Sequence, residues 1–206
     1  MRIAVVLAAL ALLVAAPLAR ADGDPASDYL LGQPTFVPPD DGVPKAYEAQ
    51  LDATVAAAKA RGYTIRVALI GTQYDLGSVS VLWHKPAQYA RFLGKELYFV
   101  YKGRLLVVMP NGLAVSKAGE LVPAEQKSIA GIAPPGSSGA ALAAAATTAV
   151  SRLAANAGVV FPVPKLGQVS TTSTNRDRLT IVGVVVVALL ALAAFMTLRR
   201  GRRPAR

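Results

Sequence analysis

The sequence predicts an α/β fold, in which a small mixed sheet flanked by helices forms a three-layer α/β/α sandwich, plus one C-terminal transmembrane helix. Three observations predict this arrangement. Helix-like and strand-like apolar spacings alternate between residues 44 and 161. Asn111-Gly112 stands between two apolar runs, which is a strong signal for a β-hairpin. Residues 179–198 contain no charged side chain and are long enough to cross a bilayer.

The first half of the predicted domain consists of a helix, a strand and a second helix. A helix is expected over 44–62, where apolar residues recur at a spacing of three to four and glycine follows (Tyr47, Leu51, Val55, Ala58, then Gly62). Residues 63–70 alternate apolar and polar side chains, which predicts a strand. Residues 71–85 are expected to form a long loop or a short irregular strand. Pro86 then starts a helix whose inward side chains are Tyr89, Phe92, Leu93 and Leu97.

The second half is expected to contain a hairpin and two helices. Residues 104–109 and 113–115 are its predicted strands, and a short helix follows over 123–132. The alanine-rich run 140–157 has a narrow apolar stripe and predicts a helix, because alanine is the best helix former. A low-complexity linker is the alternative interpretation of that run.

The N-terminal 21 residues have the features of a secretory signal peptide. Arg2 precedes an unbroken apolar run, Ile3 to Leu13, and Ala19-Arg20-Ala21 supplies small residues for a signal peptidase. Cleavage after Ala21 is expected. An uncleaved N-terminal anchor is the alternative, although a full span needs about 20 apolar residues.

The C-terminal end predicts a retained transmembrane helix over 179–198. Five arginines follow it in the tail 199–206, which the positive-inside rule places in the cytoplasm. No sortase motif precedes the apolar stretch, and a lipid-anchor signal would not carry a basic tail. A single-pass protein of the cell membrane is therefore expected, with its domain outside the cytoplasm and its C-terminus inside.

The remaining sequence divides into three parts. Residues 22–43, rich in Asp, Pro and Gly, are expected to be an irregular leader, and 44–161 the extracytoplasmic domain. Residues 162–178 contain two prolines and a run of Ser and Thr, which predicts a polar tether to the membrane.

Composition excludes several classes of protein. The net charge of +10 is concentrated in the ends, since residues 22–178 hold 15 basic and 12 acidic side chains. That balance argues against a nucleic-acid partner. With no cysteine, the chain has no disulfide, thiolate metal site or cysteine nucleophile.

Two residues are candidate ligand-binding positions, and no residue is assigned a catalytic or metal-ligating role. Asp75 comes just after the strand 63–70, where α/β sheets usually bind ligands. It could serve as a phosphatase nucleophile or metal ligand, or it could simply form a turn. His84, the only histidine, could act as a general base, or be an exposed loop residue.

Two other clusters are interpreted as structural. Asp22, Asp24 and Asp28 have a spacing like that of a calcium loop, but the glycine and final glutamate of such a loop are not in place. Tyr98, Phe99 and Tyr101 are interpreted as core residues beside basic neighbours. No Gly-x-Ser-x-Gly, P-loop or dinucleotide motif is present.

In its order of elements, the chain resembles the TPM domain of extracytoplasmic bacterial membrane proteins and thylakoid proteins. The matching segments are 47–61, 63–70, 86–97, the hairpin 105–115 and the closing segment 134–157. The segment 75–85 differs from the family's loop at that place. The resemblance implies an extracytoplasmic domain with a membrane anchor. Relatives are described both as acid phosphatases and as binding or assembly factors.

Two functions from different classes follow. The leading hypothesis is a non-enzymatic module that binds or assembles another envelope protein, with no cofactor; a transport accessory subunit would look the same in sequence. The competing hypothesis is a phosphate-ester hydrolase that uses Asp75 with bound calcium or magnesium.

Overall fold

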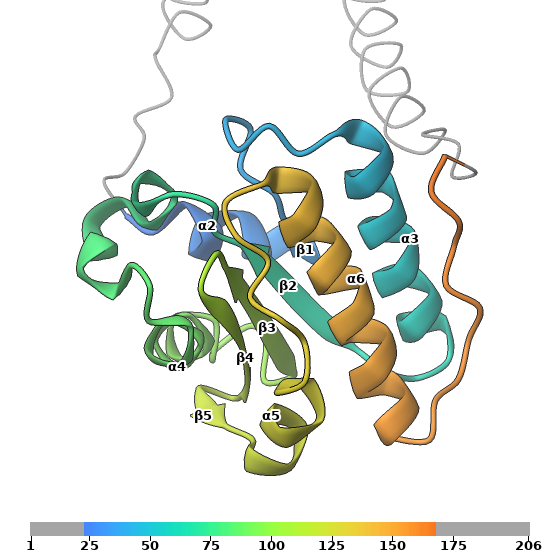
Figure 1. The fold of residues 1–206 in the computed structure, drawn as a ribbon. Helices are drawn as coiled ribbons and strands as arrows, with labels where there is room; N and C mark the ends of the chain where they lie inside the picture. The colour runs from blue at the N-terminus through green and yellow to red at the C-terminus, as the bar shows by residue number, and fades with distance from the viewer. Residues whose placement is uncertain (1–22, 168–206) are drawn as a thin grey trace, which may run out of the picture.

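The computed structural model describes residues 23–167 of the chain (Figure 1). The predicted signal peptide, transmembrane helix and basic tail lie outside the described residues. Among residues 23–167, no helix is both long enough and apolar enough to cross a membrane.

The centre of the domain is a five-stranded mixed sheet in the order β1-β2-β3-β4-β5. The first three strands are parallel and the last two run antiparallel to their neighbours. The strands are β1 (Thr35–Phe36), β2 (Ile65–Leu69), β3 (Arg104–Met109), β4 (Gly112–Lys117) and β5 (Glu120–Leu121). The helices are α2 (Pro25–Gly32), α3 (Lys45–Ala60), the 3-10 segment η1 (Gln73–Leu82), α4 (Pro86–Glu96), α5 (Pro123–Ile129) and α6 (Gly139–Asn156).

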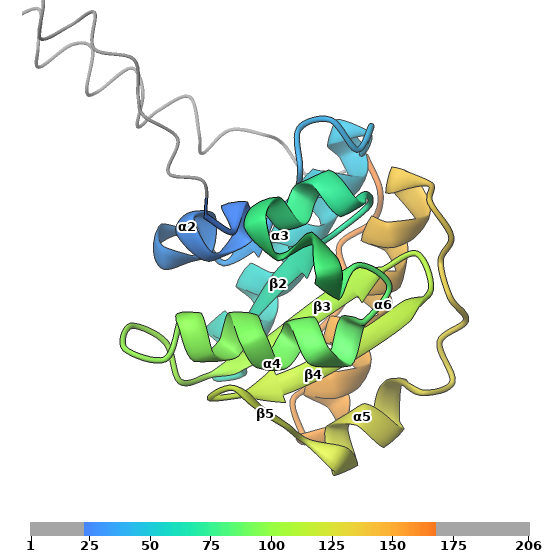
Figure 2. The ribbon, with the colours of Figure 1, turned by 90° about the vertical axis from the view of Figure 1, so that its left-hand side faces the viewer.

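Helices cover both faces of the sheet and bury a separate apolar core on each side (Figures 1 and 2). Side chains alternate between the two faces along a strand, so β2 sends Val67 and Leu69 to the core under α3 and α6. Ala68 and Ile70 go to the core under α2, η1 and α4. The predicted α/β class and its flanking helices are therefore confirmed.

The periodicity-based helices are also confirmed. Leu51, Val55 and Ala58 of α3 are buried, as are the apolar residues of α6 that form its stripe (Leu142, Ala146, Val150, Leu153). The linker alternative for the alanine-rich run is thus wrong. Small alanines let α6 lie close against α3, and the pair shares one core.

The predicted hairpin is present, but its turn lies one residue earlier than the Asn-Gly signal indicates. Met109 pairs with Gly112, so Pro110 and Asn111 form the two-residue connection. The segment 71–85, expected to be a loop or irregular strand, is mostly the 3-10 segment η1.

The expected irregular leader, residues 22–43, is corrected by the structure. Asp24 caps α2 through its side chain, and Pro25 occupies the first turn, where a missing N–H costs nothing. Leu30 of α2 is fully buried, and β1 pairs in parallel with β2. Most of this segment is therefore part of the folded domain.

The predicted tether, residues 162–178, begins as a mostly exposed segment that is attached to α3 by a hydrogen bond, just after a second bond that holds Val160. The Gln50 side chain donates to the Pro164 carbonyl at 2.7 Å, and Arg61 donates to the Val160 carbonyl at 2.8 Å. The chain thereby runs back along α3, so that the described residues begin and end at the same end of the domain (Figure 1). Residues 168–178 lie outside the described part.

The prediction that Tyr98, Phe99 and Tyr101 are core residues is wrong for two of the three. The side chain of Phe99 is 94% exposed and that of Tyr98 is 41% exposed, whereas Tyr101 is half-buried. After α4, the amides of Val100 and Tyr101 both bond to the Leu97 carbonyl, so the chain turns tightly. The turn carries Tyr98, Phe99 and Val100 outward, and these three residues are called the tip below. Figure 2 shows this α4–β3 loop projecting beyond the rest of the domain.

Candidate functional site

The candidate site lies where β2 ends, and it contains two carboxylates that share one backbone amide. The amide of Gly71 donates to Asp41 Oδ2 at 2.8 Å and to Asp75 Oδ2 at 2.9 Å. The carboxyl ends of strands are where open α/β sheets bind ligands. Asp75 therefore occupies the place expected for it, and Asp41 joins it there.

Close approach of the carboxylates requires glycine at position 71. A Cβ built on Gly71 would lie 2.2 Å from Asp41 Oδ2 and 2.4 Å from its Cγ. Any larger residue would push the Asp41 carboxylate away from the amide.

Asp75 also starts η1. Its Oδ2 accepts from the amide of Thr72 at 2.7 Å, while the Thr72 side chain accepts from the Asp75 amide, which makes a capping box. The side chain thus satisfies two backbone donors. The structure supports the turn-forming interpretation of Asp75, and the same carboxylate remains half-exposed beside Asp41.

Asp41 is the residue whose acidity changes most at this site. Burial, and after it the nearby charge of Asp75, raise the pKa of Asp41 to about 7, against the lowering effect of the Gly71 amide. Its Oδ1 is buried and accepts no hydrogen bond from the described residues. Around neutral pH Asp41 is therefore partly protonated and can donate or accept a proton.

This geometry permits two kinds of chemistry. A pair of carboxyl groups sharing a proton can act in acid–base catalysis, and the same oxygens can bind a hard divalent cation in place of the proton. Within residues 23–167, no group of three or more His, Cys, Asp or Glu side chains is placed to hold a metal ion. A cation at Asp41 and Asp75 would have to complete its shell with water or substrate.

The second candidate, His84, is not brought to this pair. It lies exposed after η1, with its backbone at φ +60° and its ring against Trp83 at 4.5 Å between centroids. Its carbonyl accepts from the Asn111 side chain at 2.7 Å. No hydrogen bond or ion pair in the described part of the chain joins His84 to Asp75.

The aspartates with calcium-like spacing have another role. Asp24 is 5% exposed; its Oδ1 accepts from the amide of Ala26 at 3.2 Å and from the hydroxyl of Tyr89 at 2.7 Å. Burial raises the pKa of Asp24 to about 6, although the Tyr89 hydrogen bond lowers it. Burial likewise raises the pKa of Tyr89. Asp24 therefore anchors α2 to α4, and Asp22 lies outside the described residues.

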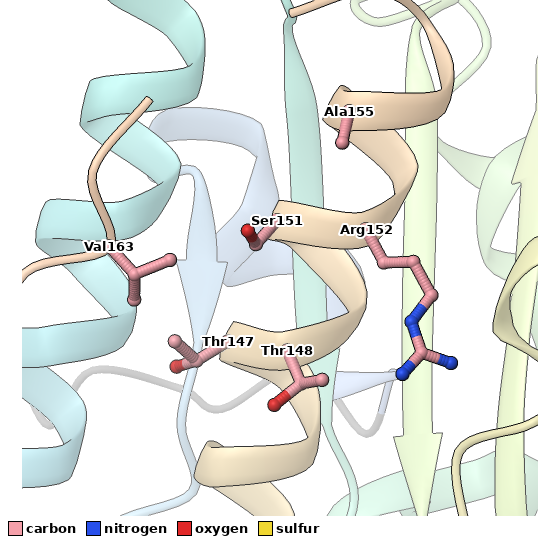
Figure 3. Close-up of a pocket in the computed structure, with 6 residues that line it drawn as sticks. All are labelled: Thr147, Thr148, Ser151, Arg152, Ala155 and Val163. Atoms are coloured by element: carbon pink, nitrogen blue, oxygen red, sulfur yellow. The ribbon is translucent and has the colours of Figure 1, made fainter. Parts of the chain in front are cut away.

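A shallow hollow of about 290 Å³ lies on the outer side of α6, away from the aspartate pair. Thr147, Ser151 and Arg152 of α6 line it together with Val163 (Figure 3). The hydroxyls of Thr147 and Thr148 donate to carbonyls of their own helix. Figure 3 shows Ser151 toward Val163 and Arg152 extending to the other side, so the polar groups do not converge.

No family model, curated protein or solved structure matches this chain.

Sequence reasoning found Asp75 and missed Asp41. The available signal is Asp40-Asp41-Gly42, an acidic turn sequence within the expected irregular leader. Gly42 has φ +61°, and this turn directs Asp41 to the end of β2. Asp41 and Gly71 are 30 positions apart, so the sequence does not show that they lie close together.

Proposed function

We propose that this chain is a single-pass membrane protein whose extracytoplasmic α/β domain is a binding or assembly module for another envelope component. The observation that carries the proposal is the exposed tip at the end of the domain opposite the chain ends. The uncharged stretch 179–198 and the arginines after it support anchoring in the cell membrane, with the C-terminus in the cytoplasm. The resemblance to the TPM family is part of the same proposal.

The tip and the chain ends lie at opposite ends of the sheet. The tip precedes the amino end of β3, whereas η1 follows the carboxyl end of β2, and these two strands are parallel. The described chain begins beside η1 and ends beside α3, over opposite faces but at the same end of the sheet (Figure 1). A domain tethered there presents the tip away from the tether, where a partner can reach it.

The chemistry of the tip suits recognition of a protein. Phe99 is 94% exposed and Val100 is 61% exposed, next to Tyr98. Aromatic side chains dominate the binding energy of interfaces, and exposed apolar patches mark interaction sites.

Two cationic side chains lie beside the tip and the adjoining Tyr101. Lys102 Nζ lies 4.6 Å from the Tyr98 ring centroid, and the Arg66 guanidinium lies 4.2 Å from that of Tyr101. Arg66 Nη1 is buried and donates no hydrogen bond to the described residues. The fitting partner therefore offers an apolar pocket for Phe99 with acidic groups at its rim.

Photocrosslinking tests the proposal in cells that make the full chain. A benzophenone amino acid at position 99 should give a discrete protein adduct, and Lys102→Gln should weaken that adduct. Tyr29, which is 52% exposed on α2, is the matched control position. Absence of an adduct from 99, or the same adduct from 29, would contradict the tip as the binding surface.

The aspartate pair favours a second candidate function, a metal-assisted phosphate-ester hydrolase. Asp41 and Asp75 meet at the carboxyl end of β2, and the pKa of Asp41 is raised to about 7 by burial. Purified full-length protein should then hydrolyse an aryl phosphate with calcium or magnesium, and Asp75→Asn or Asp41→Asn should abolish the activity. Asp40→Asn, on the exposed neighbour, is the control.

A further inference from the structure

We infer that η1 and the residue after it rest on the surface of the membrane that anchors the chain, with Tyr74, Val81 and Trp83 in the interfacial layer. These three residues are called the η1 surface. The inference rests on the proposed membrane anchoring and adds an orientation of the domain: the η1 surface toward the bilayer and the tip away from it.

The first argument is that η1 lies at the end of the sheet where the described chain both starts and stops (Figure 1). A Cβ on Gly77 of η1 would lie 2.2 Å from the carbonyl oxygen of Gly23 and 3.0 Å from Pro25 Cδ. Gly77 has φ +51°, so glycine is favoured there for conformation as well as for space. The start of the described chain is thus packed directly on η1.

The composition of η1 is the second argument. Residues 76–83 carry no charge, and the side chains of Tyr74 and Val81 are 82% and 72% exposed. Tyr and Trp are enriched at membrane interfaces, because their rings have an apolar body and a polar edge. Tyr74 and Val81 are exposed, and Trp83, directly after η1, is partly buried; their residue types match that chemistry.

The tether is the third argument. Eleven residues, 168–178, connect the described domain to the uncharged stretch, and fully extended they reach roughly 36 Å. The described chain ends beside α3, at the same end of the sheet as η1 but over the opposite face (Figure 1). Such a short connection holds the η1 surface at a high effective concentration next to the bilayer, so a few apolar side chains suffice.

Charges near η1 indicate an apolar contact rather than an electrostatic one. Asp40, Asp41 and Asp75 lie on this side, and Lys85 donates to the Val81 carbonyl at 3.0 Å. This local balance is acidic and would not favour anionic headgroups. The contact should therefore form on zwitterionic lipid and persist at high salt.

The chain's single tryptophan makes the test direct, because Trp83 reports on η1 in the unlabelled full-length protein. The protein is reconstituted in vesicles of phosphatidylcholine, with or without bromine on the acyl chains. Brominated lipid should lower Trp83 emission, at low and at high salt alike. Tyr74→Ser combined with Val81→Ser should reduce that loss.

A second reporter checks the orientation. Trp83→Phe combined with Phe99→Trp moves the tryptophan to the tip, where bromine should leave its emission unchanged. Circular dichroism confirms that each variant is folded. Quenching at 99 instead of 83, or at neither position, would overturn the inference.

Flotation of the same vesicles separates the two proposals. If the protein floats with the lipid but Trp83 is not quenched, anchoring holds and the orientation is wrong. If the protein does not float, both the anchoring and the orientation fail.

Discussion

Gly94 of α4 lies directly on the backbone of Gly119 in the turn between β4 and β5. A Cβ on Gly94 would be 2.8 Å from both the Cα and the N of Gly119. Gly119 itself has φ +79°, a backbone conformation that residues with a side chain rarely adopt. The pair sets how closely α4, and with it the tip that follows, approaches the sheet.

Gly94→Ala should destabilise the domain by about 1–3 kcal/mol, because the new methyl group meets backbone that cannot move aside cheaply. Helix propensity alone predicts the opposite, a gain of about 1 kcal/mol for alanine inside a helix. Unfolding in urea, followed by Trp83 emission of the full chain in detergent micelles, measures the difference. Gly32→Ala is the control, since nothing lies within 4 Å of a Cβ there. Equal stability of the two variants would show that the close packing is not as described.

Tyr89→Phe should destabilise the domain by about 1–3 kcal/mol, the usual cost of leaving a buried polar group short of a partner. The change removes the 2.7 Å hydrogen bond to Asp24, a carboxylate whose Oδ2 already accepts no bond from the described residues. Loss of this bond raises the pKa of Asp24 further, so the destabilisation should grow as the pH rises above about 6. The same urea titration at acidic and alkaline pH measures it. A pH-independent effect would contradict the coupling.

Asp41 should make the domain less stable as the pH rises. Its pKa is raised from 3.8 unfolded to about 7 folded, so between these values the folded state holds a proton that the unfolded state has lost. The free energy of unfolding should therefore fall over this range and level off above about pH 7. Asp24, raised to about 6, adds to the lower part of the same slope.

Asp41→Asn should flatten the upper part of this slope and increase stability in alkaline buffer, because its amide stays neutral beside Asp75. Asp40→Asn should change this slope only slightly, because the Asp40 charge is the weakest of the effects that raise the pKa of Asp41. Thermal midpoints collected across the pH range decide the matter. A slope that survives Asp41→Asn would assign the titration to another group.

Reporter fusions test the membrane topology. A fusion after Arg206 should be active only when the reporter works in the cytoplasm, because moving several arginines into hydrocarbon costs about 2.5–3.5 kcal/mol each. A fusion truncated after Gly167 should be active only when the reporter works outside. The reverse pair would exclude an extracytoplasmic domain, and full-length protein in the soluble fraction would exclude the anchor.

Elements that depend on neighbours in sequence were predictable from sequence. Three elements are predicted from local signals, and all three are present. These signals are the apolar stripe of α6 with its 3.6-residue period, the alternation of side chains in β2 and the proline that starts α4. The hairpin was placed within one residue, because its signal is the turn itself. Asp75 was found because it follows a predictable strand.

Only the tertiary structure decided the features that join distant segments. The expected leader forms α2 and β1 because Leu30 and Phe36 are buried in the core on one face of the sheet. Asp24 also accepts a hydrogen bond from Tyr89, which lies 65 positions away in the sequence. Asp41 and Asp75 come together because both accept a hydrogen bond from the amide of Gly71, and no spacing in the sequence predicts this contact. Phe99 is aromatic, and for that reason the sequence predicts it in the core. It is exposed instead, because the turn after Leu97 directs it outward. The local sequence pattern predicts which face of a helix or strand is apolar. The position of a buried carboxylate or an exposed aromatic depends instead on contacts between backbone segments that are distant in the sequence or on the path of a turn.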